Sequence, residues 1–218
     1  PMFAAFEAHV INVTATIENA LRVDTTPISF GTVFPQEQLD RLIVVNLSDS
    51  FVAEPRVDNV SYIIRQKPKC LANDTSGNTT SGHVDDNGVI SCPVGYSLLP
   101  LLCPYLSKHP DNNPIGNDGL GNDGSLDAFH QIGATSTGSW VWNDVRGYLA
   151  KSAQDLEDNW NLDLKVPCFE GNCAQDWAKY VTNINSQANP NDYVQPKGNE
   201  HKLFGCDIWI EVTGVSRI

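Results

Sequence analysis

Hydrophobic and polar residues alternate along much of the chain, and this pattern predicts strands rather than helices. One alternating stretch runs from His9 to Leu21 and another from Asn159 to Val166. A period of two residues is typical of a strand that buries one of its faces. The apolar positions of the two stretches are Ile11, Val13, Ala15 and Ile17, and then Trp160, Leu162, Leu164 and Val166.

Further strands are predicted from apolar runs that are rich in β-branched and aromatic residues. These runs occupy residues 28–34, 42–47 and 57–65, and Pro35 marks a turn after the first of them. A last strand is predicted over residues 204–215, because apolar and polar positions alternate there again. Its apolar positions on one face are Ile208, Ile210 and Val212.

The middle of the chain is predicted to contain loops and short helices. Residues 71–92 and 109–127 are rich in Asn, Asp, Gly and Thr, a composition that is typical of turns and loops. An apolar island at 98–106 predicts one or two helical turns, and residues 174–187 have helical spacing. A short strand is predicted between Trp140 and Trp142. The apolar positions of the helix predicted within 174–187 are Trp177, Tyr180, Val181 and Ile184.

Together these elements predict an all-β protein, namely a β-sandwich of jelly-roll type with long loop insertions and one or two short helices. No change in composition marks a linker between two domains. We therefore expect one domain over residues 13–218, with insertions at about 71–130 and 167–200. Residues 1–12 form an N-terminal extension ahead of it.

Charge and hydropathy exclude two classes of partner. The chain has 218 residues with 14 Lys+Arg and 26 Asp+Glu, so its formal net charge is −12. A nucleic-acid-binding protein needs a basic surface to attract phosphates, and this chain repels polyanions. No uninterrupted apolar run approaches the roughly 20 residues of a transmembrane helix. We expect neither nucleic-acid binding nor a membrane span.

The cysteines indicate an oxidising compartment. Their number is even and none forms a Cys-x-x-Cys pair, which favours three disulfides over a zinc site and an extracellular location over a cytosolic one. Cys168 and Cys173 are the pair best placed to bond, because Gly171 lets the intervening chain fold back. The alternative is six reduced thiols in the core. The six residues are Cys70, Cys92, Cys103, Cys168, Cys173 and Cys206.

The sequence contains five acceptor motifs for N-linked glycans. Each is an Asn-x-Ser/Thr triplet, which is a glycosylation signal on the surface of a secreted protein. Such triplets also arise by chance in a chain rich in Asn and Thr. The five candidates are Asn12, Asn46, Asn59, Asn73 and Asn78.

No catalytic motif is present, and we predict that the protein is not an enzyme. The chain lacks the His-Glu-x-x-His, Gly-x-Ser-x-Gly and phosphate-loop patterns, which would indicate metal-dependent, serine-dependent or nucleotide chemistry. One cofactor is conceivable, because residues 117–127 combine carboxylate and amide oxygens with glycines, as a calcium loop requires. The same residues are also ordinary in turns. The candidate calcium ligands are Asp118, Asn122, Asp123 and Asp127.

Five tryptophans offer a further alternative, because indole rings stack on sugars. Several of them lie in alternating or helical apolar patterns, which favours burial in the core over a carbohydrate platform. They are Trp140, Trp142, Trp160, Trp177 and Trp209.

The N-terminal third resembles the TasA/camelysin group. The resemblance lies in the apolar start Phe3-Ala-Ala-Phe6, the stretch Ile-Ser-Phe-Gly-Thr-Val-Phe-Pro-Gln-Glu at 28–37 and Ile-Val-Val-Asn-Leu-Ser at 43–48. It covers about residues 3–65, and the glycine that follows proline in the family is Gln36 here. Members of this group are secreted jelly-roll proteins of biofilm matrix fibres, with relatives in archaeal bundling pili.

The resemblance implies assembly by donor-strand exchange, in which the N-terminal segment of one subunit adds a strand to the next. A head-to-tail contact of this kind propagates into a filament of identical subunits. We therefore expect a structural subunit of an extracellular filament, pilus-like or in a biofilm matrix. The alternatives are a secreted monomeric adhesin or glycan-binding module, and a secreted hydrolase. The apolar residues expected in the donor strand are Met2, Phe3, Phe6, Val10 and Ile11.

Overall fold

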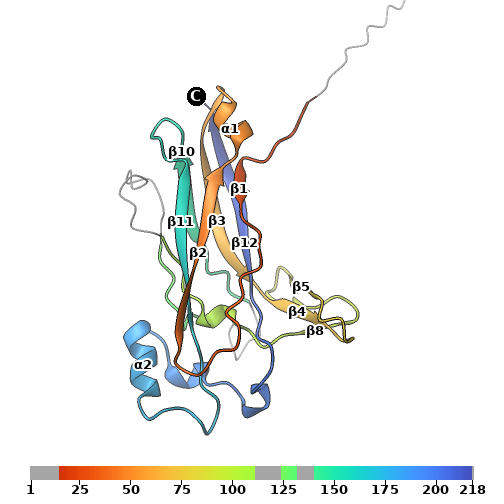
Figure 1. Cartoon of the computed structure of the whole chain (residues 1–218), viewed down its shortest axis with the longest axis vertical. Helices are drawn as coiled ribbons and strands as arrows, with labels where there is room; N and C mark the ends of the chain where they lie inside the picture. Colours follow the sequence, from red (N-terminus) through yellow and green to blue (C-terminus); the bar gives the residue numbers. More distant parts are fainter. Residues whose placement is uncertain (1–14, 111–123, 132–139, 218) are drawn as a thin grey trace, which may run out of the picture.

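The computed structural model describes residues 15–110, 124–131 and 140–217, and within them the protein is all-β, as predicted. Two antiparallel sheets form its body (Figure 1). The first has the strand order β1 (Leu21–Val23), β2 (Gln38–Leu47), β11 (Glu157–Lys165) and β9 (His109–Pro110). The second has the order β10 (Val145–Ala150), β3 (Val57–Lys67) and β12 (Asp207–Arg217).

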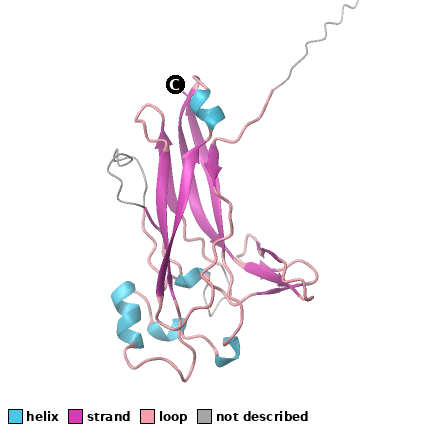
Figure 2. Ribbon diagram, viewed as in Figure 1, coloured by secondary structure: helices cyan, strands magenta, loops and turns pink. Residues whose placement is uncertain are grey.

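Smaller elements surround this body, as Figure 2 shows by colour. Two small antiparallel sheets lie between residues 69 and 98: β5 (Thr79–Ser81), β4 (Lys69–Ala72) and β8 (Tyr96–Leu98), and then β6 (His83–Val84) with β7 (Ile90–Ser91). The helices are α1 (Asp49–Ala53) and α2 (Trp177–Ile184), with the 3-10 turns η1 (Cys103–Tyr105), η2 (Pro190–Tyr193) and η3 (Lys197–Asn199).

The two main sheets pack face to face through their alternating apolar residues. Trp160 on β11 is directly opposite Ile43 on β2, and both belong to one buried core with Ile64 of β3. The indole nitrogen of Trp160 donates to the hydroxyl of Tyr62 at 2.8 Å, and this hydroxyl donates to the Asp158 carboxylate at 2.6 Å. Burial raises the pKa of Tyr62. The sheets therefore form a sandwich in which the buried polar groups of Trp160, Tyr62 and Asp158 are bonded to one another.

The predicted strands at 42–47, 57–65, 159–166 and 204–215 are confirmed as β2, β3, β11 and β12. The helix predicted within residues 174–187 is α2, and the apolar island contains η1. These segments have long runs of regular spacing, so the local pattern and the tertiary packing agree. The observed strand order does not establish a jelly roll, so the jelly-roll type stays a prediction.

The strand predicted over 28–34 is wrong. This segment is coil, because Gly31 adopts a φ of 72° and interrupts the extended backbone. Phe30 and Val33 nevertheless pack against the core. In the stretch from His9 to Leu21, the described residues 15–20 form no strand, and the ladder begins only at Leu21.

Two further sequence predictions need correction. Residues 71–92 hold short strands as well as loop, because the Cys70–Cys92 disulfide and turns at Asp74 and Asp85 fold the polar segment into hairpins. No strand lies between Trp140 and Trp142; Trp140 makes one isolated bridge, and β10 begins later, at Val145.

Three disulfides cross-link the described chain, and the predicted Cys168–Cys173 pair is confirmed. The other two, Cys70–Cys92 and Cys103–Cys206, join residues 22 and 103 positions apart, respectively. No helix in the described ranges is both long and apolar enough to cross a membrane.

Gly147 offers a test of how tightly the two sheets pack. A Cβ atom at this position of β10 would overlap the ring of Tyr62, which cannot move without breaking its bonds to Asp158 and Trp160. We expect Gly147→Ala to lower the free energy of unfolding by about 2 kcal/mol or more, as measured by urea denaturation. Gly198→Ala is the control, because nothing lies within 4 Å of a Cβ there. Equal stability of the two variants would contradict this packing.

Candidate functional site

One side of the sandwich is incompletely closed, along β12. The register places Ile210, Val212 and Val215 of β12 opposite Ile64, Tyr62 and Val60 of β3, so these side chains share the inner face of the sheet. The three β3 residues are at most 1% exposed. Val212 and Val215, however, are 41% and 47% exposed. The inner face of β12 therefore lacks the covering that β3 has.

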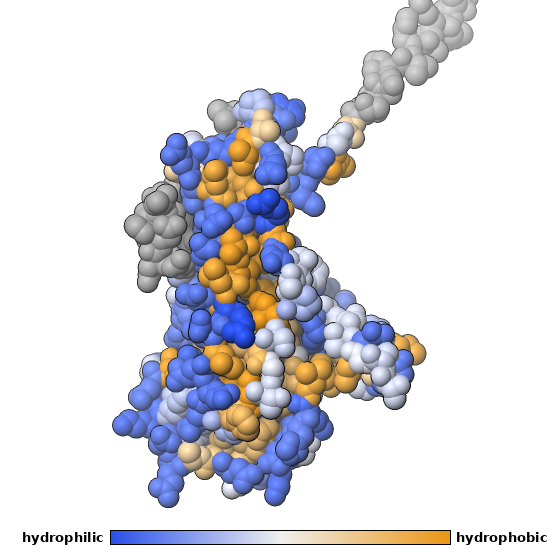
Figure 3. All heavy atoms as spheres, in the orientation of Figure 1, coloured by the Kyte–Doolittle hydropathy of each residue, from blue (hydrophilic) through white to orange (hydrophobic). Residues whose placement is uncertain are grey.

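A groove of about 690 Å³ lies beside this inner face. One wall is formed by Ile208, Ile210 and Val212, and the opposite wall by residues 19–30. Figure 3 shows a stripe of hydrophobic residues running down the middle of this face of the molecule, with hydrophilic residues on either side. The floor of the groove includes Ile43, Leu102, Leu106 and Leu162.

Backbone edges along the groove are also unpaired. β12 pairs with β3 along one edge, and no strand among the described residues pairs with its other edge. β1 covers only three residues of β2, from Val45 to Leu47. A free strand edge with an apolar groove beside it can accept both the hydrogen bonds and the side chains of an added strand.

Polar groups and a disulfide hold the end of the groove where β12 begins. The Cys103–Cys206 disulfide fixes the residue just before β12. Asp207 accepts from the Lys69 ammonium at 2.5 Å and from the Ser81 hydroxyl at 2.6 Å. These contacts fix the first residues of β12 and hold that wall of the groove in place.

Side-chain contacts also hold the opposite wall of the groove, which residues 19–30 form. Asp24 accepts hydrogen bonds from the backbone and the hydroxyl of Thr26, and these bonds lower the pKa of its carboxyl. The Arg41 guanidinium lies 5.2 Å from the centre of the Phe30 ring. Arg41 is opposite Leu162 in the pairing of β2 with β11, and its guanidinium holds the Phe30 ring, which lines the groove.

The chain enters the body at one corner of the sandwich, next to α1. Ser48 donates from its hydroxyl to the carbonyl of Asn19 at 2.6 Å and from its backbone to the carbonyl of Ala20 at 2.9 Å. Residues 15–19 are all exposed, and the side chain of Ile17 is 94% exposed. In Figure 1 this segment leads away from the sandwich beside α1. Apart from the bond to the Asn19 carbonyl, the described end of the alternating N-terminal stretch is therefore exposed and joins no sheet of its own body.

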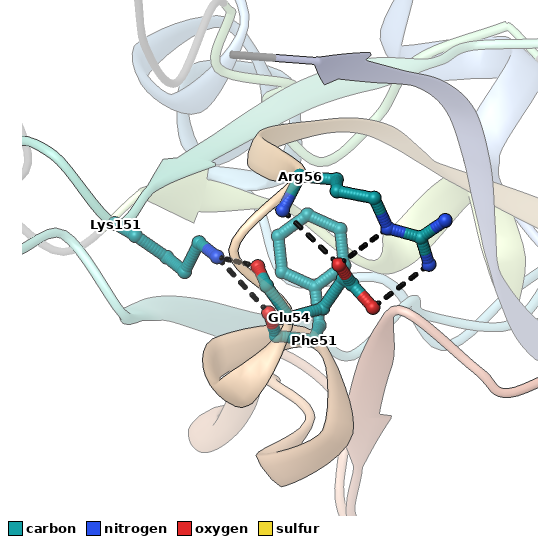
Figure 4. A network of polar contacts seen from close by, with 4 residues as sticks. All are labelled: Phe51, Glu54, Arg56 and Lys151. Carbon is teal, nitrogen blue, oxygen red and sulfur yellow. Dashed lines mark hydrogen bonds and ion pairs between the residues drawn. The ribbon is translucent and has the colours of Figure 1, made fainter.

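A compact network keeps α1 in place at this corner (Figure 4). The Lys151 ammonium, just after β10, donates to the carbonyls of Phe51 and Glu54 at 3.2 and 2.5 Å. The Arg56 guanidinium bonds to both oxygens of Glu54 and lowers the pKa of that carboxyl to about 2. A cation on the last carbonyls of a helix satisfies groups that have no partner within it. The departure point of the N-terminal segment is therefore rigidly held.

The predicted donor residues lie outside the described part of the chain, so the structure does not place Met2, Phe3, Phe6, Val10 or Ile11. The same holds for the candidate calcium ligands Asp118, Asn122 and Asp123. Asp127 is exposed and lies 3.8 Å from His109. The described residues contain no group of three or more potential metal ligands, and the calcium loop stays a prediction.

The four described sequons differ in accessibility. Asn73 and Asn78 are exposed at the ends of the turn between β4 and β5. Asn46 and Asn59 are only partly exposed within paired strands. The fifth, Asn12, lies outside the described residues. If the protein carries glycans, Asn73 and Asn78 are the accessible acceptors.

The five tryptophans divide into two groups. Trp140, Trp160 and Trp177 are buried, as their apolar patterns predicted, whereas Trp142 and Trp209 are 37% and 43% exposed. Trp209 alternates with the inward residues of β12 and therefore lies on the outer face of its sheet.

Comparisons with protein-family models, curated proteins and solved structures found no match for this chain. The resemblance to the TasA/camelysin group therefore rests on the short motifs of the N-terminal third alone.

The groove itself was not predicted from the sequence. The alternation of β12 indicates which side chains face inward, but a buried and an uncovered inner face have the same pattern. The nearest signal in the sequence was indirect: residues 9–21 alternate like a strand, yet their described part at 15–20 joins no sheet.

Proposed function

We propose that this protein is a structural subunit of an extracellular filament, in which the N-terminal segment of one copy occupies the groove of the next. The observation that carries this proposal is the uncovered inner face of β12, where Val212 and Val215 point inward yet remain exposed. The occupant is a second copy of this chain, because its own sequence supplies an alternating apolar segment whose described end, at Ile17, is exposed.

The segment and the groove match in pattern and length. The groove follows β12 from Asp207 to Val212, and six extended residues span about 20 Å. The N-terminal segment offers two alternating apolar runs of comparable length: Phe6, Ala8 and Val10, which span five residues, and then Ile11, Val13, Ala15 and Ile17, which span seven. An inserted strand would pair with the free edge of β12 and place every second side chain on the apolar floor.

Strand addition would also complete the architecture. The described body has four strands in one sheet and three in the other. A donated strand beside β12 would make two four-stranded sheets, which is the strand number of a jelly roll. Because the donor segment and the acceptor groove are different surfaces, the contact is heterologous and propagates from subunit to subunit.

The three disulfides support an oxidising compartment. An extracellular location is the natural one for such a filament, and the short motifs shared with secreted fibre proteins point the same way. Net charge of −12 would keep the subunit dispersed before assembly.

The groove can be tested directly with a synthetic peptide of residues 1–17 and the chain truncated before residue 15. We expect the peptide to bind the truncated chain, and Val212→Lys to weaken binding at least tenfold, because an ammonium would be buried among apolar side chains. Isothermal titration calorimetry measures the dissociation constant of the peptide for each variant.

Leu42→Lys is the matched control. Leu42 is also an exposed apolar strand residue, at 55%, but it alternates with the inward Ile43 and is not part of the groove. Equal binding by the Val212→Lys and Leu42→Lys variants would contradict the groove as the acceptor. Absence of binding by the unsubstituted truncated chain would contradict strand donation altogether.

A further inference from the structure

A second hollow, separate from the groove, lies on the outer face of the three-stranded sheet. Its volume is about 230 Å³. Outward side chains of β3 and β12 line it, together with the loop before β10 and a wall that contains β6. The lining residues that the argument uses are Arg65, Lys67, His83, Trp142, Trp209 and Glu211.

The hollow holds the two exposed tryptophans, and each indole is paired with a cation. The Arg65 guanidinium lies 5.0 Å from the centre of the Trp142 ring, and the Lys67 ammonium lies 2.7 Å from the centre of the Trp209 ring. Arg65 and Lys67 are two residues apart on the central strand, so both point to this face. Cation–π contacts of this kind fix the orientation of both rings.

The two cations of the hollow differ in their ion pairs. Arg65 is paired with Asp144 at 2.9 Å and with Glu211 at 3.5 Å. Lys67 forms no ion pair with any described residue. Partial burial and the neighbouring Arg65 charge lower the pKa of the Lys67 ammonium. Glu211 and Asp207 also attract the Lys67 ammonium, but neither forms an ion pair with it. Lys67 is therefore the cation of the hollow that can still take an anion as a direct partner.

We infer that this hollow binds a single ring of an acidic saccharide, with Lys67 on the carboxylate and the two indoles against the ring. Fixed aromatic faces with a few convergent polar groups are typical of small-ligand sites. Arg65 and His83 supply donors for hydroxyl groups, and Glu211 supplies an acceptor. The volume is below the roughly 300–1,000 Å³ of sites for drug-sized ligands, which limits the occupant to about one ring.

This inference does not rest on filament assembly, because the hollow is on the outer face of β12 and the groove on its inner face. The binding experiment is therefore done on both the full chain and the chain without residues 1–14. The probes are methyl β-D-glucuronide and methyl β-D-glucoside, observed by saturation-transfer NMR and by tryptophan fluorescence. We expect the glucuronide to bind both forms of the protein, and more tightly than the glucoside.

Variants assign the binding to this hollow. We expect Trp209→Ala and Trp142→Ala to weaken glucuronide binding about tenfold, with near-ultraviolet circular dichroism confirming the fold. Lys67→Gln should abolish the preference for glucuronide over glucoside. Lys179→Gln, an exposed lysine on α2, is the control and should change nothing.

Three results would overturn the inference. The first is the absence of saturation transfer to either sugar, and the second is unchanged binding by both tryptophan variants. The third is displacement of glucuronide by a hexaglutamate peptide that binds more tightly than the sugar, which would assign the hollow to acidic peptides.

Discussion

Removal of residues 1–14 is expected to leave a folded subunit that forms no filaments. The described sandwich, its three disulfides and the groove all lie outside this segment, so the truncated chain keeps its core. It loses the apolar strand that would fill the groove of its neighbour. Negative-stain electron microscopy and sedimentation velocity of the full and truncated chains measure the difference.

A full-length variant with substituted side chains distinguishes the contribution of the apolar side chains from that of the backbone of the segment. Replacing Phe3, Phe6, Val10 and Ile11 by serine keeps the backbone but removes the side chains that would occupy the groove. We expect this variant to behave like the truncation, because ladder hydrogen bonds alone do not offset the cost of ordering the segment. Filaments formed by the truncated chain would refute strand donation by this segment.

Loss of the Cys103–Cys206 disulfide is expected to have the largest effect on stability. The bond joins residues 103 positions apart, and constraining so long a loop in the unfolded chain is worth about 4–5 kcal/mol. Cys103→Ser with Cys206→Ser should therefore lower the free energy of unfolding by about this amount, as measured by guanidinium denaturation. The double variant should also bind the N-terminal peptide more weakly, because Cys206 anchors the start of β12 beside the groove.

The Cys168–Cys173 disulfide provides the matched control. It encloses a loop of only a few residues, for which the same reasoning gives about 2 kcal/mol. It also lies outside the groove lining. Equal losses of stability from the two double variants, or unchanged peptide binding by the Cys103/Cys206 variant, would contradict the role assigned to the longer cross-link.

The regular part of the fold could be predicted from local pattern. The alternation at Trp160, Leu162 and Leu164 identifies the inward face of β11, and these residues are buried as expected. The Cys168–Cys173 pair was predictable because its partners are close in sequence. Cys103 and Cys206 were not, because their pairing depends on how η1 meets the start of β12.

The groove was less predictable than the strands, because it exists where no strand covers the inner face of β12. The alternation of a strand does not show whether another strand covers it. Residues 28–34 have strand composition, yet they form coil, since Gly31 breaks the extended backbone, and Ile28 and Phe30 of this segment line the groove. Val212 has the same alternation as the buried residues of β3 and is exposed only because no strand covers it. Similarly, nothing in the spacing of Trp142 and Trp209 shows that they share a hollow with Arg65 and Lys67.

Cryo-electron microscopy of the unreduced full-length protein tests the central claim most directly. The account predicts thin filaments of uniform width, in which density for residues 1–14 of one subunit lies along β12 of the next and fills the groove over Ile208, Ile210 and Val212. Dispersed monomers at high concentration, or an N-terminal segment folded into the groove of its own subunit, would contradict it.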